Sequence, residues 1–388
     1  MSQNRKTYLK HVKRVVIKIG SGVLTRKNGL NLNIIDDLAT EICRLRKKRL
    51  EIILVSSGAI AAGLKKAGLS KRPASVSQMQ ALAAMGQSNL ITAYEDAFSR
   101  HGTKAAQILL TRDDLTHRRR FLNARNTLRT LLTWDIIPII NENDTVGTDE
   151  IKFGDNDNLS ALVVNLTESH LLVNLTNIDG LFDKDPREHS DAQLIPLVEK
   201  VDRRLARAAN TIPGFLGTGG MASKLKAAKT IGMGGIACII ANGLRANILK
   251  DIFAGKPCGT FFLPEVIPLN SRKQWIAFTK KTRGVITVDA GAQKALTQSG
   301  KSLLPSGIIE IQDKFRVGDS VTIQNSHQQM IALGMVNYNS GDLLKIMGAN
   351  SGEIEVILGY RHDDEIVHRD NLVLASQLEN DDTKYFDS

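Results

Sequence analysis

Cysteine is scarce in this chain of 388 residues, which holds only Cys43, Cys238 and Cys258. Three thiols spread so widely cannot build a disulfide framework or a zinc cage, and they suit a reducing compartment. No apolar run approaches the roughly 18 residues that a membrane span needs. The basic first residues are not followed by the apolar stretch of a secretory signal. We therefore expect a soluble, cytoplasmic protein with no membrane partner.

Hydrophobic and charged side chains occur in ordinary globular proportions, at 42% and 23%. This composition excludes a chain that is disordered throughout, and the length suggests two or three domains. Residues 281–388 carry 10 basic and 15 acidic side chains, whereas residues 1–280 carry 41 basic and 25 acidic ones. A basic body suits a phosphate, a carboxylate or a nucleic acid as ligand. A solvated helix surface is the other interpretation, and it suits the run at residues 44–49.

Short β-branched runs alternate with longer helical stretches over the first 265 residues. Continuous apolar strands separated by helices predict an α/β fold, with a mostly parallel open sheet sandwiched by helices. The expected strands are Arg14–Ile19, Glu51–Val55, Ala105–Leu110, Ile136–Ile140, Leu171–Leu175 and Ile236–Ile240. The expected helices are Asn33–Arg49, Ser75–Arg100, Arg119–Trp134, Asn158–Leu166 and Met221–Gly232. Ligands of such folds bind beyond the carboxyl ends of the strands.

The pattern changes near residue 265, where prolines and the KKTRG stretch indicate a linker. Short strands separated by turns follow, which predicts a small, mostly β domain. The expected strands there are Val285–Val288, Ile308–Ile311, Ser320–Ile323, Ile331–Val336 and Glu353–Ile357. We therefore divide the chain into an α/β domain (10–265), a linker (266–282), a β domain (283–375) and an acidic tail (376–388).

Two turns that follow the first two expected strands are rich in small residues. In the first, Lys18 precedes the turn Gly20-Ser21-Gly22; the second, at residues 55–63, reads VSSGAIAAG. Glycine lets backbone amides approach an anion closely, and Lys18 can place its ammonium on a phosphate. Either turn alone is compatible with simple helix packing. Two such turns favour a site for two anionic groups, or for one phosphoryl group held from two sides.

The segment after the strand IIPII gathers Asn and Asp side chains, at residues 141–144 and again at 155–158. Helix capping explains one or two of them, and Asp157 can cap the helix expected from Asn158. An amino-acid substrate needs an acceptor for its ammonium and donors for its carboxylates, and this segment can supply both. Metal binding is a further interpretation, but the run from 155 to 157 lacks the rest of a calcium loop.

A fourth stretch, LGTGGMASKLKAA at residues 216–228, combines a glycine-rich turn with Lys224, one turn into the helix that follows. Its amides and its lysine predict a second phosphate-binding element. A flexible loop with a surface lysine is the simpler interpretation. It fits less well, because two glycine–lysine elements occur in one domain.

Taken together, these motifs resemble those of the amino acid kinase superfamily, and within it the glutamate 5-kinase family. The resemblance runs nearly end to end and includes VVIKIGSGVLT, LVSSGAIAAG, INENDTV, IKFGDNDNLSA and GTGGMASK. The β domain resembles a PUA domain, which bacterial members of that family often carry. The resemblance implies transfer of the γ-phosphoryl group of ATP to the γ-carboxylate of L-glutamate. The product would be γ-glutamyl phosphate, in the first step of proline biosynthesis.

The resemblance also implies roles for matching positions. Lys18, Asp157 and Lys224 would be catalytic, with Asp157 orienting the two lysines. Glutamate would be held by Ser57, Gly58, Asn141, Asp144 and Asn156, with Asp144 at its α-ammonium. ATP would be bound by Lys18, Gly20, Ser21, Thr176, Asn177, Thr218, Gly219, Gly220, Met221, Ala222, Ser223 and Lys224. Mg²⁺ is expected mainly through the ATP phosphates, without a dedicated set of protein ligands.

Elementary chemistry agrees with this reaction. A glutamate side chain has an ordinary pKa of about 4.3, so at neutral pH it is already an ionised nucleophile. No general base is needed, and none of the four motifs contains histidine. The remaining difficulty is the repulsion between an anionic nucleophile and an anionic phosphate, which lysines, amides and Mg²⁺ reduce.

The family resemblance further implies proline as a feedback inhibitor near the glutamate pocket, and a homo-oligomer of two or four subunits. Two alternatives stay open. One is another kinase of the superfamily, acting on aspartate, N-acetylglutamate or a nucleoside monophosphate, although INENDTV and GDNDNLSA favour free glutamate. The other is an RNA-binding PUA protein. The acidic balance and few aromatic side chains of residues 281–388 argue against an RNA partner.

Overall fold

The computed structural model describes residues 2–26, 29–147, 156–202, 205, 220–265, 273, 276 and 282–379. The chain forms two compact units that divide between Pro268 and Leu269. The expected linker lies almost wholly outside the described residues, as does the expected tail from residue 380 onward. Residues 376–379, which we expected in the tail, belong to a short helix, α16 (Ala375–Glu379).

The first unit is built on an eight-stranded sheet with the order β5-β6-β4-β1-β7-β9-β10-β8. Its described pairings are parallel, except that β10 runs antiparallel to β9. The strands are β1 (Arg14–Ile19), β4 (Glu51–Ser56), β5 (Ala105–Leu110), β6 (Ile137–Glu142), β7 (Leu171–Thr176), β8 (Leu197–Val198), β9 (Ala237–Asn242) and β10 (Thr260–Phe262), with a small pair β2 (Thr25–Arg26) and β3 (Gly29–Leu30). The six strands predicted here are confirmed to within two residues. β8 and β10 are too short to show a period in the sequence.

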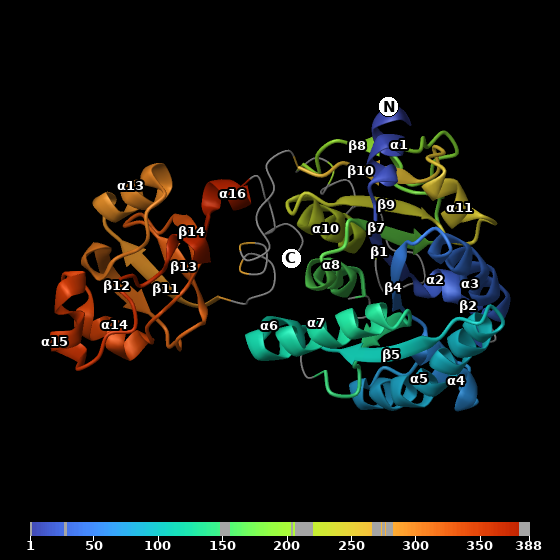
Figure 1. The fold of residues 1–388 in the computed structure, drawn as a ribbon, viewed down its shortest axis with the longest axis horizontal. Coiled ribbons are helices and arrows are strands. Elements are labelled where there is room, and N and C mark those ends of the chain that lie inside the picture. The colour runs from blue at the N-terminus through green and yellow to red at the C-terminus, as the bar shows by residue number, and fades with distance from the viewer. Residues whose placement is uncertain are drawn as a thin grey trace. The chain divides into compact units, whose positions relative to one another are not determined.

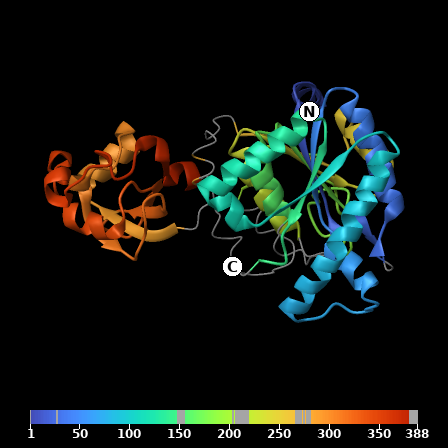
Figure 2. The same ribbon diagram turned by 60° about the horizontal axis from the view of Figure 1, so that its bottom comes forward.

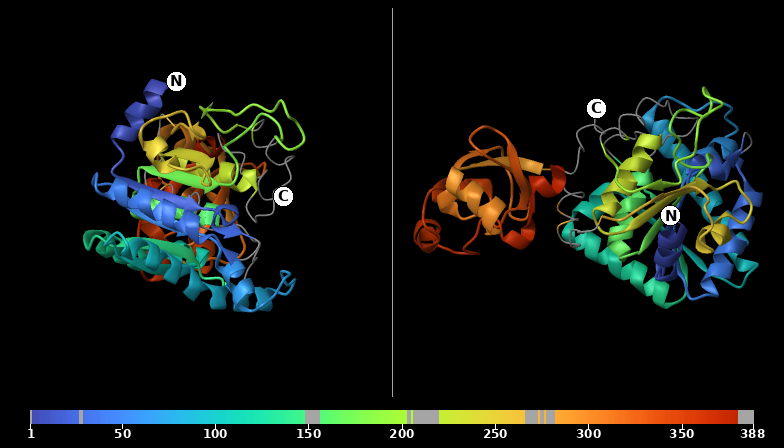
Figure 3. Two further views of the ribbon diagram at one scale, coloured as in Figure 1. Left: turned by 90° about the vertical axis from the view of Figure 1, so that its right-hand side faces the viewer. Right: turned by 90° about the horizontal axis from the view of Figure 1, so that it is seen from above.

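Helices cover both faces of this sheet. They are α1 (Ser2–Lys10), α2 (Ser21–Leu24), α3 (Leu32–Arg46), α4 (Ala59–Lys66), α5 (Val76–Ser99), α6 (Arg112–Thr116), α7 (Arg118–Thr133), α8 (Asn156–Thr167), α10 (Met221–Gly232) and α11 (Ile248–Phe253). Figure 1 shows α8 and α10 on one side of the strands and α3 and α11 on the other, and Figure 3 shows the same layers from above. Within the described ranges, none of the helices combines the length and apolar character that a membrane crossing requires.

Side chains of the central strands alternate between the two helical layers. Val15, Ile17 and Ile19 of β1 pack into the core cluster that also contains the buried apolar residues of α3 and α11 and of the second half of α5. Because neighbouring side chains of a strand point to opposite faces, Lys18 faces the α8 and α10 layer. β1 pairs with β7 in a register that sets Lys18 beside Asn174. Two polar side chains therefore enter the same face of a largely apolar sheet.

Helices α4 and α5 lie side by side and meet backbone to backbone (Figure 2). A Cβ atom added at Gly63 would lie 1.9 Å from the carbonyl oxygen of Leu82. Only glycine allows this approach, so the hairpin depends on its small residues. α4 starts directly after Gly58, whose φ of 104° suits glycine. The packing of this hairpin therefore fixes the turn that follows β4.

The second unit contains a five-stranded mixed sheet with the order β12-β11-β13-β14-β15. Its elements are β11 (Thr282–Val288), α13 (Ala290–Ser299), η1 (Pro305–Gly307), β12 (Ile308–Gln312), β13 (Ser320–Gln324), β14 (Met330–Met335), α14 (Ser340–Ile346), η2 (Ser351–Glu353), α15 (Ile354–Leu358), η3 (Arg369–Asn371), β15 (Leu372–Leu374) and α16. A separate apolar core lies between the sheet and its helices. Four of the five strands expected in this unit are confirmed.

The expected strand at Glu353–Ile357 is wrong, because this segment is helical. The side chain of Asn350 accepts from the backbone N–H of Glu353, and the backbone N–H of Asn350 donates to Glu353 Oε2 at 2.8 Å, which forms a capping box. Gly359, with a φ of 78°, ends the helix. The alternation of acidic and apolar residues resembled a strand, but only Ile354 of the helix α15 is buried in the core. The fifth strand is β15.

Candidate active site

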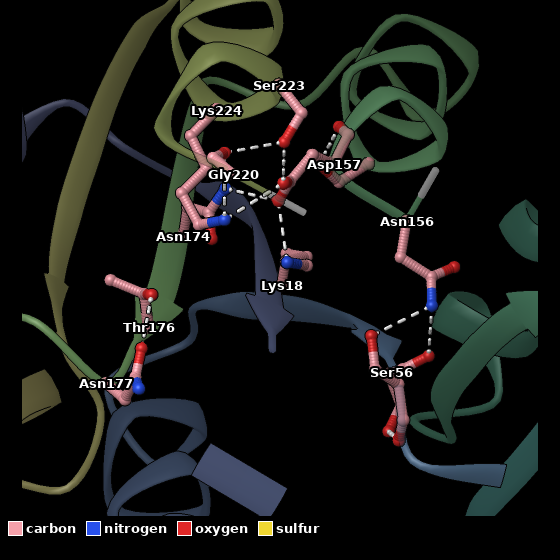
Figure 4. A network of polar contacts seen from close by, with 12 residues as sticks. Lys18, Ser56, Asn156, Asp157, Asn174, Thr176, Asn177, Gly220, Ser223 and Lys224 are labelled. Atoms are coloured by element: carbon pink, nitrogen blue, oxygen red, sulfur yellow. Dashed lines mark hydrogen bonds and ion pairs between the residues drawn. The ribbon is translucent and has the colours of Figure 1, made fainter. Parts of the chain in front are cut away.

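The carboxylate of Asp157 lies at the centre of a buried polar cluster (Figure 4). Its Oδ1 atom is 2.6 Å from Lys18 Nζ and accepts a hydrogen bond of 2.8 Å from Asn174 Nδ2. Its Oδ2 atom accepts from Ser223 Oγ at 2.6 Å and from Lys224 Nζ at 3.1 Å. Each oxygen therefore accepts from one ammonium and one neutral donor.

Four separate elements bring these side chains together. Lys18 is the last but one residue of β1, and Asn174 lies in β7. Asp157 lies in the first turn of α8, and Lys224 lies in the first turn of α10, which begins after Gly220. The three charged side chains are enclosed, with exposed fractions of 4%, 0% and 5%. Asp157 does not cap the helix expected from Asn158. The helix begins at Asn156, one residue before Asp157. The carboxylate of Asp157 contacts the two lysines.

The two ammoniums control the charge state of this cluster. Burial alone would raise the pKa of Asp157, but Lys18 and Lys224 outweigh burial and hold the pKa below its ordinary value. Burial lowers the pKa of Lys18, and repulsion from Lys224 acts in the same direction, while Asp157 opposes both. With both lysines charged, the group of three carries one excess positive charge. Such a group suits an anionic ligand.

A second polar cluster adjoins the first at the start of α8. Asn156 Nδ2 is within hydrogen-bond distance of Ser57 Oγ (2.9 Å), Ser56 O (3.1 Å) and Asn141 Oδ1 (3.1 Å). Asn156 Oδ1 is buried and has no hydrogen-bond partner among the described residues. Ser57 precedes Gly58 in the turn between β4 and α4, and Asn141 belongs to β6. Three of the expected glutamate-binding side chains therefore meet here.

Asp144 lies in the turn after β6 and is partly exposed. Burial raises the pKa of Asp144 to about 6, and the positive charge of Arg72 opposes that rise. Arg72 belongs to the loop between α4 and α5 and was not among the expected site residues. α5 also supports the segment that carries Asp144, because Gln80 Nε2 donates to the carbonyl of Gly147 at 3.1 Å.

The expected nucleotide residues are partly engaged within the protein. Gly20 N–H donates to Leu175 O at 2.9 Å, so it is not free for a phosphate. Helix α2 begins at Ser21, and the first N–H groups of a helix lack intrahelical acceptors. A Cβ atom at Gly22 would lie 3.1 Å from Asn177 Cγ, which brings this turn beside the end of β7. Thr176 ends that strand.

At the start of α10, the hydroxyl of Ser223 reaches both Asp157 and Gly220 O (2.8 Å). A hydroxyl has one proton, so the shorter contact with the carboxylate uses it. Met221 is buried, and Ala222 is the second residue of the helix. Thr218 and Gly219 lie outside the described residues. Among the described residues, no three His, Cys, Asp or Glu side chains are grouped as a metal site.

Asn174 is a further site residue that the sequence reasoning missed. A single asparagine inside the apolar strand LLVNLT was a signal, because a buried amide needs partners. Ser56 is a second such residue, since its hydroxyl is buried 3.0 Å from the Tyr94 hydroxyl. The motif VSSGAIAAG contains Ser56, but only Ser57 and Gly58 of that motif were expected in the site.

Comparison with known proteins agrees with this geometry. The family model "Amino acid kinase family" matches residues 13–242, and the model "PUA domain" matches residues 284–358. Curated relatives named glutamate 5-kinase include those of Geobacter sulfurreducens, 53% identical over 95% of this chain and 100% of the relative, and of Syntrophus aciditrophicus, 50% identical over 96% and 97%. A relative of the same name from Caldanaerobacter subterraneus subsp. tengcongensis is 49% identical over 94% and 99%. The chain therefore belongs to the amino acid kinase family, within its glutamate 5-kinase group, and ends in a PUA domain.

Proposed function

We propose that this protein transfers the γ-phosphoryl group of ATP to the γ-carboxylate of L-glutamate, which gives γ-glutamyl phosphate and begins proline biosynthesis. The observation that carries the proposal is the placement of Lys18 and Lys224, far apart in the sequence, on the two oxygens of one buried carboxylate. Relatives that are about half identical over nearly the whole chain bear the name of this activity.

The buried residues fit the phosphates of ATP. With both lysines charged, Lys18, Asp157 and Lys224 together carry one excess positive charge in an enclosed site. The attraction between this charge and an anion is stronger there than in water, because the interior of a protein has a lower dielectric constant. We assign the phosphates to Lys18, Ser21 and Lys224 and the nucleoside side to Thr176 and Asn177. Gly20 shapes the turn, since its own N–H is bonded to Leu175. Mg²⁺ bound by the nucleotide would supply further positive charge at the phosphates.

The polar cluster around Asn156 fits a small zwitterion. The Oδ1 atom of Asn156, which has no hydrogen-bond partner among the described residues, is an acceptor for an ammonium, and Ser57 and the turn at Gly58 offer donors for a carboxylate. Asp144, negatively charged above a pH of about 6, adds a counter-charge for the α-ammonium. Asn141 holds Asn156 in place through its own amide oxygen.

These residues meet the chemical demands of the reaction. An oxygen of the ionised γ-carboxylate attacks the γ-phosphorus, and the bond from that phosphorus to the bridging oxygen of ADP breaks. No proton needs to leave the nucleophile, so the protein supplies no base. Lys18 and Lys224 stabilise the negative charge on the transferring group and on the leaving ADP. Asp157 holds the two ammoniums on its two carboxylate oxygens, so that both are directed to the transferring phosphoryl group.

The activity is tested by supplying the purified protein with ATP, Mg²⁺, glutamate and hydroxylamine. We expect γ-glutamyl hydroxamate to form, with little product from aspartate or N-acetylglutamate under the same conditions. Turnover of one of those two acceptors in place of glutamate would overturn the choice of substrate. A protein that makes none of these products would overturn the reaction class.

The remaining expectations belong to the same proposal. Proline is expected to raise the KM for glutamate in the hydroxamate assay, and the chain is expected to form dimers or tetramers in the cytoplasm. We assign the kinase domain to residues 10–265 and the PUA domain to 283–375, with a linker between them and an acidic tail after them. RNA is not an expected partner, because residues 281–388 are acidic overall.

A further inference from the structure

Asn174 is a polar residue in a largely apolar strand. β7 reads LLVNLT, all six residues are buried, and the exposed fraction of Asn174 is 0%. A polar side chain in such a place costs free energy unless it is hydrogen-bonded. Packing alone would be served better by an apolar side chain, so this amide needs another explanation.

Within the part of the chain that the structure describes, only one end of the Asn174 amide has a partner. Asn174 Nδ2 donates to Asp157 Oδ1 at 2.8 Å, whereas its Oδ1 atom is buried and has no hydrogen-bond partner among the described residues. The reverse orientation would set the amide oxygen against a carboxylate oxygen. An unpaired buried carbonyl is destabilising. The bond from Nδ2 to Asp157 must offset that cost, so the contribution of this side chain lies in that bond.

The surroundings of Asp157 show what the bond can do. A carboxylate offers about four acceptor positions, and here they are shared by two ammoniums and two neutral donors (Figure 4). Asn174 shares Oδ1 with Lys18, and Ser223 shares Oδ2 with Lys224. The neutral donors therefore occupy the positions that a second ammonium would need. This keeps one ammonium on each oxygen.

We propose that Asn174 is a positioning residue for phosphoryl transfer, because its amide holds the Asp157 carboxylate in the orientation that separates Lys18 from Lys224. The inference rests on the proposed kinase function and deepens it. Asn174 acts through Asp157 and does not touch substrate. The register that sets Asn174 beside Lys18 on adjacent strands makes this support rigid. When the Lys18 ammonium turns toward the transferring group, the amide remains on Oδ1 and keeps the carboxylate in place.

The first test is Asn174→Leu, which removes the donor and keeps a similar volume. We expect kcat to fall about 10-fold, the scale of one hydrogen bond to a charged group, while the KM values for ATP and glutamate change less than about twofold. Asn165→Leu is the matched control, because the Asn165 amide in α8 lacks hydrogen-bond partners among the described residues. This control should keep the wild-type kcat. A folded Asn174→Leu protein with the wild-type kcat would overturn the inference.

The second test is Asn174→Asp, which keeps the shape and introduces a carboxyl group against Asp157. Two carboxyl groups at this distance share one proton, and the protonated form restores a donor to Oδ1. We expect the ratio of variant to wild-type kcat to be low at pH 8.5 and to rise as the pH falls to 6.5. A merely structural role would change the midpoint of thermal unfolding and leave this ratio flat, which would overturn the inference.

The wild-type protein separates the two possible failures. If it forms no γ-glutamyl hydroxamate, the proposed function falls, and the role of Asn174 falls with it. If it is active and both Asn174 variants match it over the whole pH range, only the role of Asn174 is overturned.

Discussion

Gly86 of α5 faces the carbonyl oxygen of Ala59 in α4 so closely that a Cβ atom on Gly86 would lie 1.8 Å from that oxygen. The same atom would lie 2.5 Å from the backbone nitrogen of Gly63. Since both contacts are with backbone atoms, no side chain can move aside to make room. The helices must separate if either glycine is enlarged.

Gly86→Ala is therefore expected to destabilise the protein. In an isolated helix, alanine is favoured over glycine by about 1 kcal/mol, but here the methyl group forces the helices apart at a cost of about 1–3 kcal/mol. Urea unfolding measures the difference. Gly352→Ala is the control, because a Cβ atom there meets nothing within 4 Å. A Gly86→Ala protein as stable as the wild type would contradict the close packing of α4 on α5.

Lys224→Ala is expected to lower kcat at least about 100-fold, the scale of losing one charge-stabilising donor at a reacting group. The fold should persist, because Asp157 retains its 2.6 Å contact with Lys18. Steady-state hydroxamate kinetics give kcat, and circular dichroism checks the fold. Lys48→Ala, an exposed lysine after α3, should behave as the wild type. A near-normal kcat in the Lys224 variant would show that this ammonium does not serve the reaction.

Asp144 gives the site a pH dependence with a definite sign. Its pKa is raised to about 6 by burial, so it is neutral below that pH and negatively charged above it. If Asp144 binds the α-ammonium of glutamate, kcat/KM should fall as the pH falls through about 6. The substrate's own side chain titrates lower, at about 4.3. The pH profile of kcat/KM reports groups of the free enzyme.

Asp144→Asn should lower kcat/KM for glutamate at least about 10-fold at pH 7.5, because a charged hydrogen bond is lost. It should also remove the decline near pH 6. Kinetics between pH 5 and 8 on both proteins check this. A decline that persists unchanged in the variant would assign it to another group.

The sequence was enough to place the strands that carry the site. Lys18 could be located near the end of β1 because a continuous β-branched run stops at a glycine turn, and Lys224 because a glycine turn precedes a clear helix. The two lysines come together through a long-range contact, which depends on the order of strands β1, β7 and β9 in the sheet. The family resemblance, rather than periodicity, suggested that Asp157 joins them.

Other features of the structure depend on contacts that the local sequence pattern does not reveal. Asp157 looked like a helix cap because aspartate before an apolar helix usually is one; two lysines from distant segments changed its role. The segment at Glu353–Ile357 alternates like a strand, yet the Asn350–Glu353 capping box starts a helix there. Gly20 was expected to offer its amide to a phosphate, but this N–H donates to the carbonyl of Leu175 near the end of β7.

Asn156 and Asp157 are consecutive residues in the first turn of α8, and their side chains belong to different polar clusters. Successive residues of a helix project about 100° apart, so one peptide unit fixes the placement of the proposed glutamate site around Asn156 against the lysine pair on Asp157. No hinge between domains has to set that spacing. If the proposed roles hold, changes in the surroundings of Asn156 would alter the choice of acceptor molecule and leave the contacts of Asp157 with the two lysines in place.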